Sequence, residues 1–160
     1  MKGRAGRVLA AFGALVALAG LSVAIGAPLG LFSGSPPSDL GATGGRLRVG
    51  DWRPNWVSSQ VPAFEPHHVA PISAATDPAA AWRALEAAIA AEPRAKVVTR
   101  RPGYLHVEFA TRVLGFVDDA EFLLEAPAGL IHVRSGARLG IRDFGVNRAR
   151  VERIRSRLAP

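Results

Sequence analysis

The 160-residue chain has room for one ordinary domain and a short appendage, and its 49% apolar content is enough to bury a core. The chain contains no cysteine, which excludes disulfides, thiol catalysis and lipid attachment through an N-terminal cysteine. The net charge of +7 is concentrated at the two ends. Residues 33–133 carry 9 basic and 11 acidic side chains, whereas residues 134–160 carry eight arginines against two acids.

The chain begins with a basic flank, residues 1–7, followed by an uncharged apolar run at residues 8–32. As a helix this run would be about 37 Å long, enough to cross a hydrocarbon core of about 30 Å. We therefore predict one transmembrane anchor over 8–32. The positive-inside rule keeps the basic flank in the cytoplasm and sends the remainder across the membrane. The expected location is the bacterial inner membrane, with the C-terminal domain in the periplasm or outside the cell.

A cleaved signal peptide is the alternative interpretation of the same run. Ala24 and Gly26 suit the positions before a cut at Ala27, and the product would then be secreted. The apolar region of a signal peptide is usually shorter, roughly 7 to 15 residues, and this run continues past Ala27. The sequence therefore favours an anchor that is not cleaved.

A Gly-, Ser- and Pro-rich stretch at residues 33–45 is typical of a flexible tether. We expect residues 46–160 to form a single domain after it.

The domain is expected to begin with an extended arm. Prolines interrupt every periodic pattern between residues 46 and 64, and Trp52, Trp56 and Val57 are predicted to hold this arm against the domain. Residues 67–72, with the sequence HHVAPI, are predicted to be a short first strand.

A helix is predicted between Asp77 and Glu92. Asp77 is a good N-cap, Pro78 suits the first helical position, and the Glu92–Pro93 step ends the helix. Its expected apolar face comprises Trp82, Leu85 and Ile89.

Four strands follow the helix, separated by turn sequences at Arg101–Gly103 and around Gly129. We predict these strands at residues 95–100, 104–110, 115–125 and 130–136. The order of the segments predicts that the strands form an antiparallel meander.

A last helix is predicted over residues 147–159, with Asn147 as its N-cap and an apolar stripe of Val151, Ile154 and Leu158. The predicted fold class is α+β: a four-stranded antiparallel meander, with a fifth short strand as an option, packed against two helices and preceded by one transmembrane helix.

Four fragments of the domain form a recognisable combination: PNWVSSQ, APIS, GFVDDAEF and VRSGARLGIRDFGVNRARVERI. Together they resemble the bacterial domain of unknown function family 1499. The resemblance runs from Asp51 to Leu158 and implies no established activity, cofactor or catalytic residue. Members are commonly membrane-anchored or exported, which agrees with the N-terminus. Many members have a cysteine pair where this chain has Gly50 and Trp56, so a redox or metal role of that pair is not expected.

The acids of the third predicted strand are the main candidates for chemistry. Successive side chains on a strand point to opposite faces, so Asp118 lies with large apolar groups while Asp119 and Glu121 share the other face. A buried carboxylate needs a cation, and Arg134, Arg138 and Arg142 follow on the next strand and loop. A structural ion-pair network is favoured over an anion pocket. The candidate anion or ligand site comprises Asp118, Asp119, Glu121, Arg134, Arg138, Arg142, Asp143, Asn147 and Arg148.

The polar residues elsewhere indicate no catalytic nucleophile, metal or cofactor. Ser58 and Ser59 lie in no nucleophile elbow and have no obvious histidine partner. The four histidines lack the converging spacing of a metal site.

The arginines near the C-terminus divide into two predicted groups. Arg134 and Arg138, with Asp143, are expected to tie the sheet to the last helix. The helix arginines are expected to face solvent in preference to anionic lipid or an acidic envelope polymer, and no aromatic stacking pattern suggests nucleic acid. This second group comprises Arg148, Arg150, Arg153 and Arg157.

The sequence favours a membrane-anchored envelope domain that binds a small amphiphile or an envelope component without chemistry. An apolar cavity between helix and sheet would support this function. One alternative is an enzyme that acts on an anionic substrate through Asp118, Asp119 or Glu121 with Arg134. Another is a structural or assembly role in the envelope.

Overall fold

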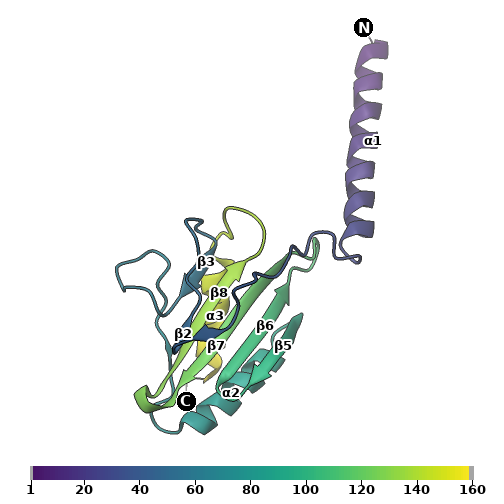
Figure 1. Cartoon of the computed structure of the whole chain (residues 1–160). Coiled ribbons are helices and arrows are strands. Elements are labelled where there is room, and N and C mark those ends of the chain that lie inside the picture. Colours follow the sequence, from purple (N-terminus) through teal and green to yellow (C-terminus); the bar gives the residue numbers. More distant parts are fainter. Residues whose placement is uncertain (1, 159–160) are drawn as a thin grey trace.

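The computed structural model describes residues 2–158, with their side chains from residue 6 onward. A long helix, α1 (Lys2–Gly26), stands clear of a folded domain that contains the other elements (Figure 1). The stretch Gly6–Gly26 is long and apolar enough to cross a membrane, and its apolar window is not buried inside the protein. Such a helix is compatible with a single-pass anchor or a signal sequence.

The helix α1 is offset from the apolar run at residues 8–32. It begins inside the basic flank and ends at Gly26. Pro28 has no N–H with which to continue the helix, and Gly30 has a φ of +70°. Residues 27–33 therefore form turns, in which the Leu31 N–H donates to the Gly26 carbonyl at 3.0 Å.

The main sheet has six antiparallel strands in the order β3-β8-β7-β6-β5, and β4 pairs with the other half of the same β8 edge. The four long consecutive strands confirm the predicted meander, and the α+β class is confirmed with it. The strands are β3 (Trp56–Ser58), β4 (Ile72–Ser73), β5 (Ala95–Arg101), β6 (Tyr104–Ala110), β7 (Val117–Glu125) and β8 (Leu130–Ala137).

The turn between β7 and β8 is a short 3₁₀ helix, η1 (Ala126–Ala128), that ends at Gly129. Gly129 has a φ of +63°, a backbone conformation that glycine adopts without strain. A Cβ at this position would also lie 2.7 Å from the Ala75 Cα atom, so the close approach of two loops requires glycine as well.

The predicted arm contributes the edge strand β3. Trp56 and Val57 are buried as expected, but Trp52 is 76% exposed, so the expectation that it holds the arm is wrong. The expected strand at residues 67–72 is reduced to β4 at its end and to an isolated bridge between Ser58 and His68.

One face of the sheet is covered by the two helices α2 (Pro78–Ala90) and α3 (Val146–Leu158) (Figure 1). The Asp77 carboxylate caps α2, as predicted, by accepting the Ala80 N–H at 2.9 Å. Leu85 and Ile89 of α2 are buried together with Val151 and Ile154 of α3. These side chains and the apolar strand residues beneath them form one continuous core.

The predicted N-cap of the last helix is wrong. Asn147 lies inside the first turn of α3, and its own N–H donates to the Asp143 carboxylate at 2.9 Å. Asp143 is therefore the residue that satisfies this end of the helix. Asn147 is instead completely buried and uses its side chain elsewhere.

The opposite face of the sheet, called the outer face below, is crossed by a small hairpin of β1 (Ala42–Thr43) and β2 (Arg46–Leu47) (Figure 1). Leu47 is 4% exposed, and the Gly41 N–H donates to the Glu121 carboxylate at 2.7 Å. The end of the predicted tether thus has contacts with the sheet that its composition does not indicate.

Candidate anion-binding site

The outer face of β6, β7 and β8 carries polar side chains where the helix-covered face carries apolar ones. The antiparallel register places Glu108 opposite Asp119, and Glu121 opposite Arg134. Asp119, Glu121 and Arg134 are each at most 3% exposed. Such groups are costly to bury unless each is paired, so their partners define the chemistry of this face.

Asp119 is held by two side chains, Arg138 and His106. The Arg138 guanidinium donates to both carboxylate oxygens, at 2.8 and 2.7 Å, and also to Glu108. His106 Nε2 lies 2.8 Å from Asp119 Oδ1. Burial acts to raise the pKa of Asp119, but the hydrogen bonds from Arg138 and His106 outweigh it and hold the pKa below its usual value. Arg138 is thereby fully neutralised.

Glu121 is satisfied mainly by neutral donors. The Tyr104 hydroxyl and the Gly41 N–H both donate to its Oε1 at 2.7 Å. Burial, followed by this hydrogen bond to Glu121, raises the pKa of the Tyr104 hydroxyl, which keeps it a donor. The contact of Glu121 Oε2 with Arg134 Nη1 is longer, at 3.4 Å.

Arg134 is the least satisfied charge of the outer face. Its side chain is 4% exposed, the long contact with Glu121 is its one salt bridge, and its buried Nε has no hydrogen-bond partner in residues 2–158. Burial lowers the pKa of the Arg134 guanidinium, and the charge of Arg48 lowers it further. An incompletely paired buried cation beside a second cation is a place where an anion would be stabilised.

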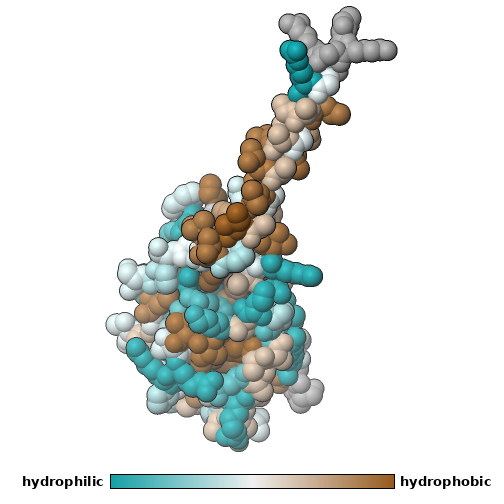
Figure 2. All heavy atoms as spheres, turned by 90° about the vertical axis from the view of Figure 1, so that its right-hand side faces the viewer, coloured by the Kyte–Doolittle hydropathy of each residue, from teal (hydrophilic) through white to brown (hydrophobic). Residues whose placement is uncertain are grey.

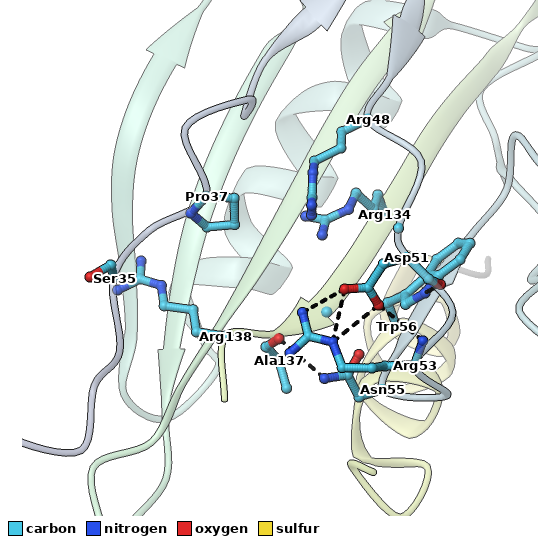
Figure 3. Close-up of a pocket in the computed structure, with 12 residues that line it drawn as sticks. Ser35, Pro37, Arg48, Asp51, Arg53, Asn55, Trp56, Arg134, Ala137 and Arg138 are labelled. Atoms are coloured by element: carbon cyan, nitrogen blue, oxygen red, sulfur yellow. Dashed lines mark hydrogen bonds and ion pairs between the residues drawn. The ribbon is translucent and has the colours of Figure 1, made fainter. Parts of the chain in front are cut away.

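The guanidinium groups of Arg48 and Arg134 point toward one another in a pocket of about 220 Å³ between the arm and β8 (Figure 3). Arg53, Arg138 and the acid Asp51 also line the pocket.

Two other arginines of the pocket, Arg48 and Arg53, each form an ion pair with an aspartate. Arg48 pairs with Asp39, whose side chain is 58% exposed. Arg53 pairs with Asp51, and this hydrogen bond lowers the pKa of the Asp51 carboxyl. Ion pairs near solvent are weak, generally below about 1 kcal/mol. Arg48 can therefore exchange its partner for an anion inside the pocket.

Glycines let Trp56 form the wall beside Arg134. A Cβ on Gly50 would lie 2.2 Å from the indole of Trp56, and one on Gly136 would lie 2.9 Å from the Trp56 Cβ atom. The indole also stacks on His67 at 4.0 Å and donates to the Asp51 carbonyl at 2.8 Å. Gly50 and Trp56 are thus in direct contact.

Four of the predicted site residues, Asp119, Glu121, Arg134 and Arg138, lie together on the outer face. Asp118 lies on the helix-covered face and pairs with Arg150 of α3 at 2.6 Å.

The remaining predicted residues lie apart from the pocket. Asp143 caps α3, and Asn147 binds Ser135 and Arg150 below the helix. Arg148 donates to the carbonyls of Pro66 and His68. Arg142 is exposed and has no ion pair with the described part of the chain.

The expectation that the last helix presents its arginines to solvent is wrong for Arg148 and Arg150, because both bind groups of the domain. Arg150 is 6% exposed and lies over the ring of Phe109. Arg153 and Arg157 are half-exposed and bind the buried carboxylate of Glu92. Hydrogen bonds from Arg153 lower the pKa of Glu92 despite burial.

Sequence reasoning missed Arg48 and Arg53, because both belong to the arm, where no local periodicity marks them. It also missed a partner of Ser59. The Ser59 hydroxyl lies 3.2 Å from His132 Nδ1, and His132 Nε2 lies 2.8 Å from Glu125.

The Ser59 hydroxyl has a structural explanation. It accepts the Val133 N–H at 2.9 Å, while the Ser59 N–H donates to the Val133 carbonyl at 2.8 Å. The side chain thereby continues the β3–β8 ladder beyond the end of β3. Within residues 2–158, no three His, Asp or Glu side chains converge as metal ligands.

Comparison with known proteins gives one assignment. No match to the chain is found among curated proteins. A family model described as "Protein of unknown function (DUF1499)" matches residues 51–158, which include the six-stranded sheet, α2 and α3. The match begins after Arg48, so the arm's contribution to the pocket lies partly outside it. This chain belongs to the DUF1499 family of proteins of unknown function.

Proposed function

We propose that this protein is a single-pass, membrane-anchored envelope domain that binds an anionic group, without chemistry of its own, between Arg48 and Arg134. The apolar helix α1 and its basic flank support anchorage with the domain on the far side of the membrane. The observation that carries the binding function is the buried Arg134 guanidinium, which has one long ion pair and faces a second arginine.

The size of the pocket favours a small anionic group. Its volume of about 220 Å³ is below the roughly 300–1,000 Å³ of sites that enclose drug-sized ligands. A carboxylate or phosphate group matches the fork of a guanidinium. Core side chains such as Phe122 and Leu85 fill the centre of the space between the helices and the sheet, which disfavours a whole amphiphile there.

The positions of the three acids that an enzyme would use, Asp118, Asp119 and Glu121, favour binding over catalysis. Asp118 and Asp119 lie on opposite faces, and each is buried in an ion pair. Glu121 is 0% exposed and accepts from Tyr104 and Gly41. A general acid or base must reach the proton that it transfers, and these groups are enclosed by their partners.

The proposal is tested with the full chain in detergent and inorganic phosphate as the probe. Phosphate is expected to raise the melting temperature of the wild-type protein in a saturable way, because a ligand that binds only the folded state stabilises it. Arg48→Gln is expected to abolish this shift. Arg83→Gln, which removes an exposed arginine on α2, is the matched control and keeps the shift.

A second variant separates binding from the stability of the arm. Arg134→Gln removes the buried guanidinium and is expected to lose phosphate binding in direct calorimetric titration. Equal phosphate binding by the wild type, Arg48→Gln and Arg83→Gln would show that the pocket is not an anion site.

A further inference from the structure

The end of the domain at which α1 joins exposes large apolar side chains. Three segments meet at this end: residues 48–55 before β3, residues 111–116 between β6 and β7, and residues 138–146 after β8. The exposed side chains there are Val49, Trp52, Val113, Phe116, Leu139, Ile141, Phe144 and Val146.

The opposite end of the sheet has no such side chains. Its turns at residues 101–104 and 125–130 contain no exposed large apolar residue. Elsewhere in residues 46–158, the exposed large apolar side chains are Phe64, Val97 and Val98. Exposed apolar side chains that are concentrated at one end of a domain mark an interaction surface.

The position of α1 identifies the partner of this surface. The Phe32 ring, just after α1, packs edge-on against Phe116 with centroids 6.2 Å apart. A Cβ on Gly115 would lie 3.2 Å from the Ala27 carbonyl oxygen, so the 111–116 segment touches the end of the helix. Figure 2 shows hydrophobic side chains gathered where α1 meets the domain. A membrane crossed by α1 would lie against these loops.

The composition of the three segments suits the boundary between lipid head groups and acyl chains. Trp52 is 76% exposed and Phe144 is 93% exposed, and aromatic residues are enriched at membrane interfaces. Arg112 and Arg142 are exposed beside them and can attract anionic head groups. Asp143 fixes the last loop by accepting the N–H groups of Gly145 and Asn147, which holds Phe144 outward.

We propose that this end of the domain lies in the interface of the bilayer, with the side chains of the 111–116 and 138–146 segments among the lipids. This docking rests on the membrane anchorage proposed above. It also brings the arginine pocket close to the head groups, because residues 51 and 53 of the pocket flank Trp52.

The test uses single-cysteine labels in the full chain, which has no native cysteine. Val113→Cys and Ile141→Cys carry a fluorophore at the docking end, and Ala128→Cys in η1 carries it at the opposite end as the control. Each labelled chain is placed, one per nanodisc, in phosphatidylcholine with a minority of phosphatidylglycerol. Emission is quenched either by nitroxide-labelled lipid or by aqueous iodide.

Labels at 113 and 141 are expected to be quenched by the lipid nitroxide at least several-fold more than the label at 128, and to be protected from iodide. Docking would be overturned if iodide quenched the labels at 113 and 141 as strongly as the label at 128. It would also be overturned if these two labels were protected from iodide but were not quenched by the lipid nitroxide. Flotation with vesicles tests the anchor separately. A chain that does not float overturns anchorage and docking together, whereas a floating chain with water-exposed labels overturns docking alone.

Discussion

The two faces of the sheet are built from the same strands but carry side chains of different chemistry. On the face covered by α2 and α3, β6 and β7 contribute apolar side chains such as Val107, Phe109 and Phe122. On the outer face their neighbours are polar and equally buried, including His106 and Glu121. Strand alternation therefore separates a packed core from a charged layer across one sheet.

The outer face is more polar than folding requires. A buried ion pair contributes little net stability compared with apolar side chains of similar volume, because both charges lose their hydration. The end of the tether supplies one donor here, the Gly41 N–H to Glu121, whereas the arm places a second cation, Arg48, beside Arg134. Arg134, with one long ion pair and an unpartnered Nε within residues 2–158, is the feature of this face that the proposed anion recognition would explain.

The largest expected effect comes from the helix-covered face. Phe122→Ala removes a fully buried ring, which should cost about 3–5 kcal/mol of unfolding free energy. The adjacent Leu123→Ala acts on the outer face, where the side chain is half-buried, and should cost about half as much. Urea titration of both variants measures the difference. Equal losses would contradict the division between a core face and a charged face.

The adjacent aspartates compare the two faces directly. Asp119→Asn leaves Arg138 with Glu108 as its remaining carboxylate, and should cost about 3 kcal/mol. Asp118→Asn should cost less, about 1–2 kcal/mol, because burial already disfavours the ionised Asp118 carboxyl and Arg150 keeps hydrogen bonds to Asn147 and Ser135. Urea titration of both variants gives the two unfolding free energies and their order. A greater loss of stability for Asp118→Asn than for Asp119→Asn would contradict this prediction.

The same pair predicts opposite responses to acid. Burial raises the pKa of Asp118 despite Arg150, so its contribution to stability is fully present below about pH 3.9 and is lost as the pH rises through the folded-state pKa. Arg138 and His106 overcome burial and lower the pKa of Asp119, so its contribution is present above about pH 3.9 and is lost as the pH falls through the folded-state pKa.

Unfolding free energies measured between about pH 3 and pH 7 separate these contributions. Asp119→Asn should flatten the loss of stability on acidification, because it removes a group whose contribution disappears in acid. Asp118→Asn should steepen that loss. If both substitutions changed the pH profile in the same direction, the two carboxylates would have the same environment.

Sequence patterns predicted the helix-covered face better than the outer face for a physical reason. Hydrophobic periodicity reports burial in an apolar core, and it located Leu85, Ile89, Val151 and Ile154 correctly. It could not show that Arg150 is buried, because that burial depends on Asp118 from a distant strand.

The pocket was harder to predict than the ion pairs around it. Strand alternation placed Asp119 and Glu121 on one face, and Arg134 and Arg138 followed from the next strand. Arg48, in contrast, reaches the pocket only because the arm folds back over β7 and β8. No local pattern encodes such a return.

The smallest effect concerns the balance of charge at Arg134. Glu121→Gln removes the carboxylate that competes with an incoming anion, while its amide oxygen can still accept from Tyr104 and Gly41. The variant should be less stable without phosphate, and its affinity for phosphate should rise several-fold because Arg134 is left without a fixed counter-charge. Glu65→Gln, at an exposed acid on the loop after β3, is the charge-matched control and should leave the affinity unchanged. Calorimetric titration of the wild type and the two variants at one ionic strength measures the affinity for phosphate. If Glu121→Gln had the affinity of the wild type, the long contact with Glu121 would not limit access to Arg134.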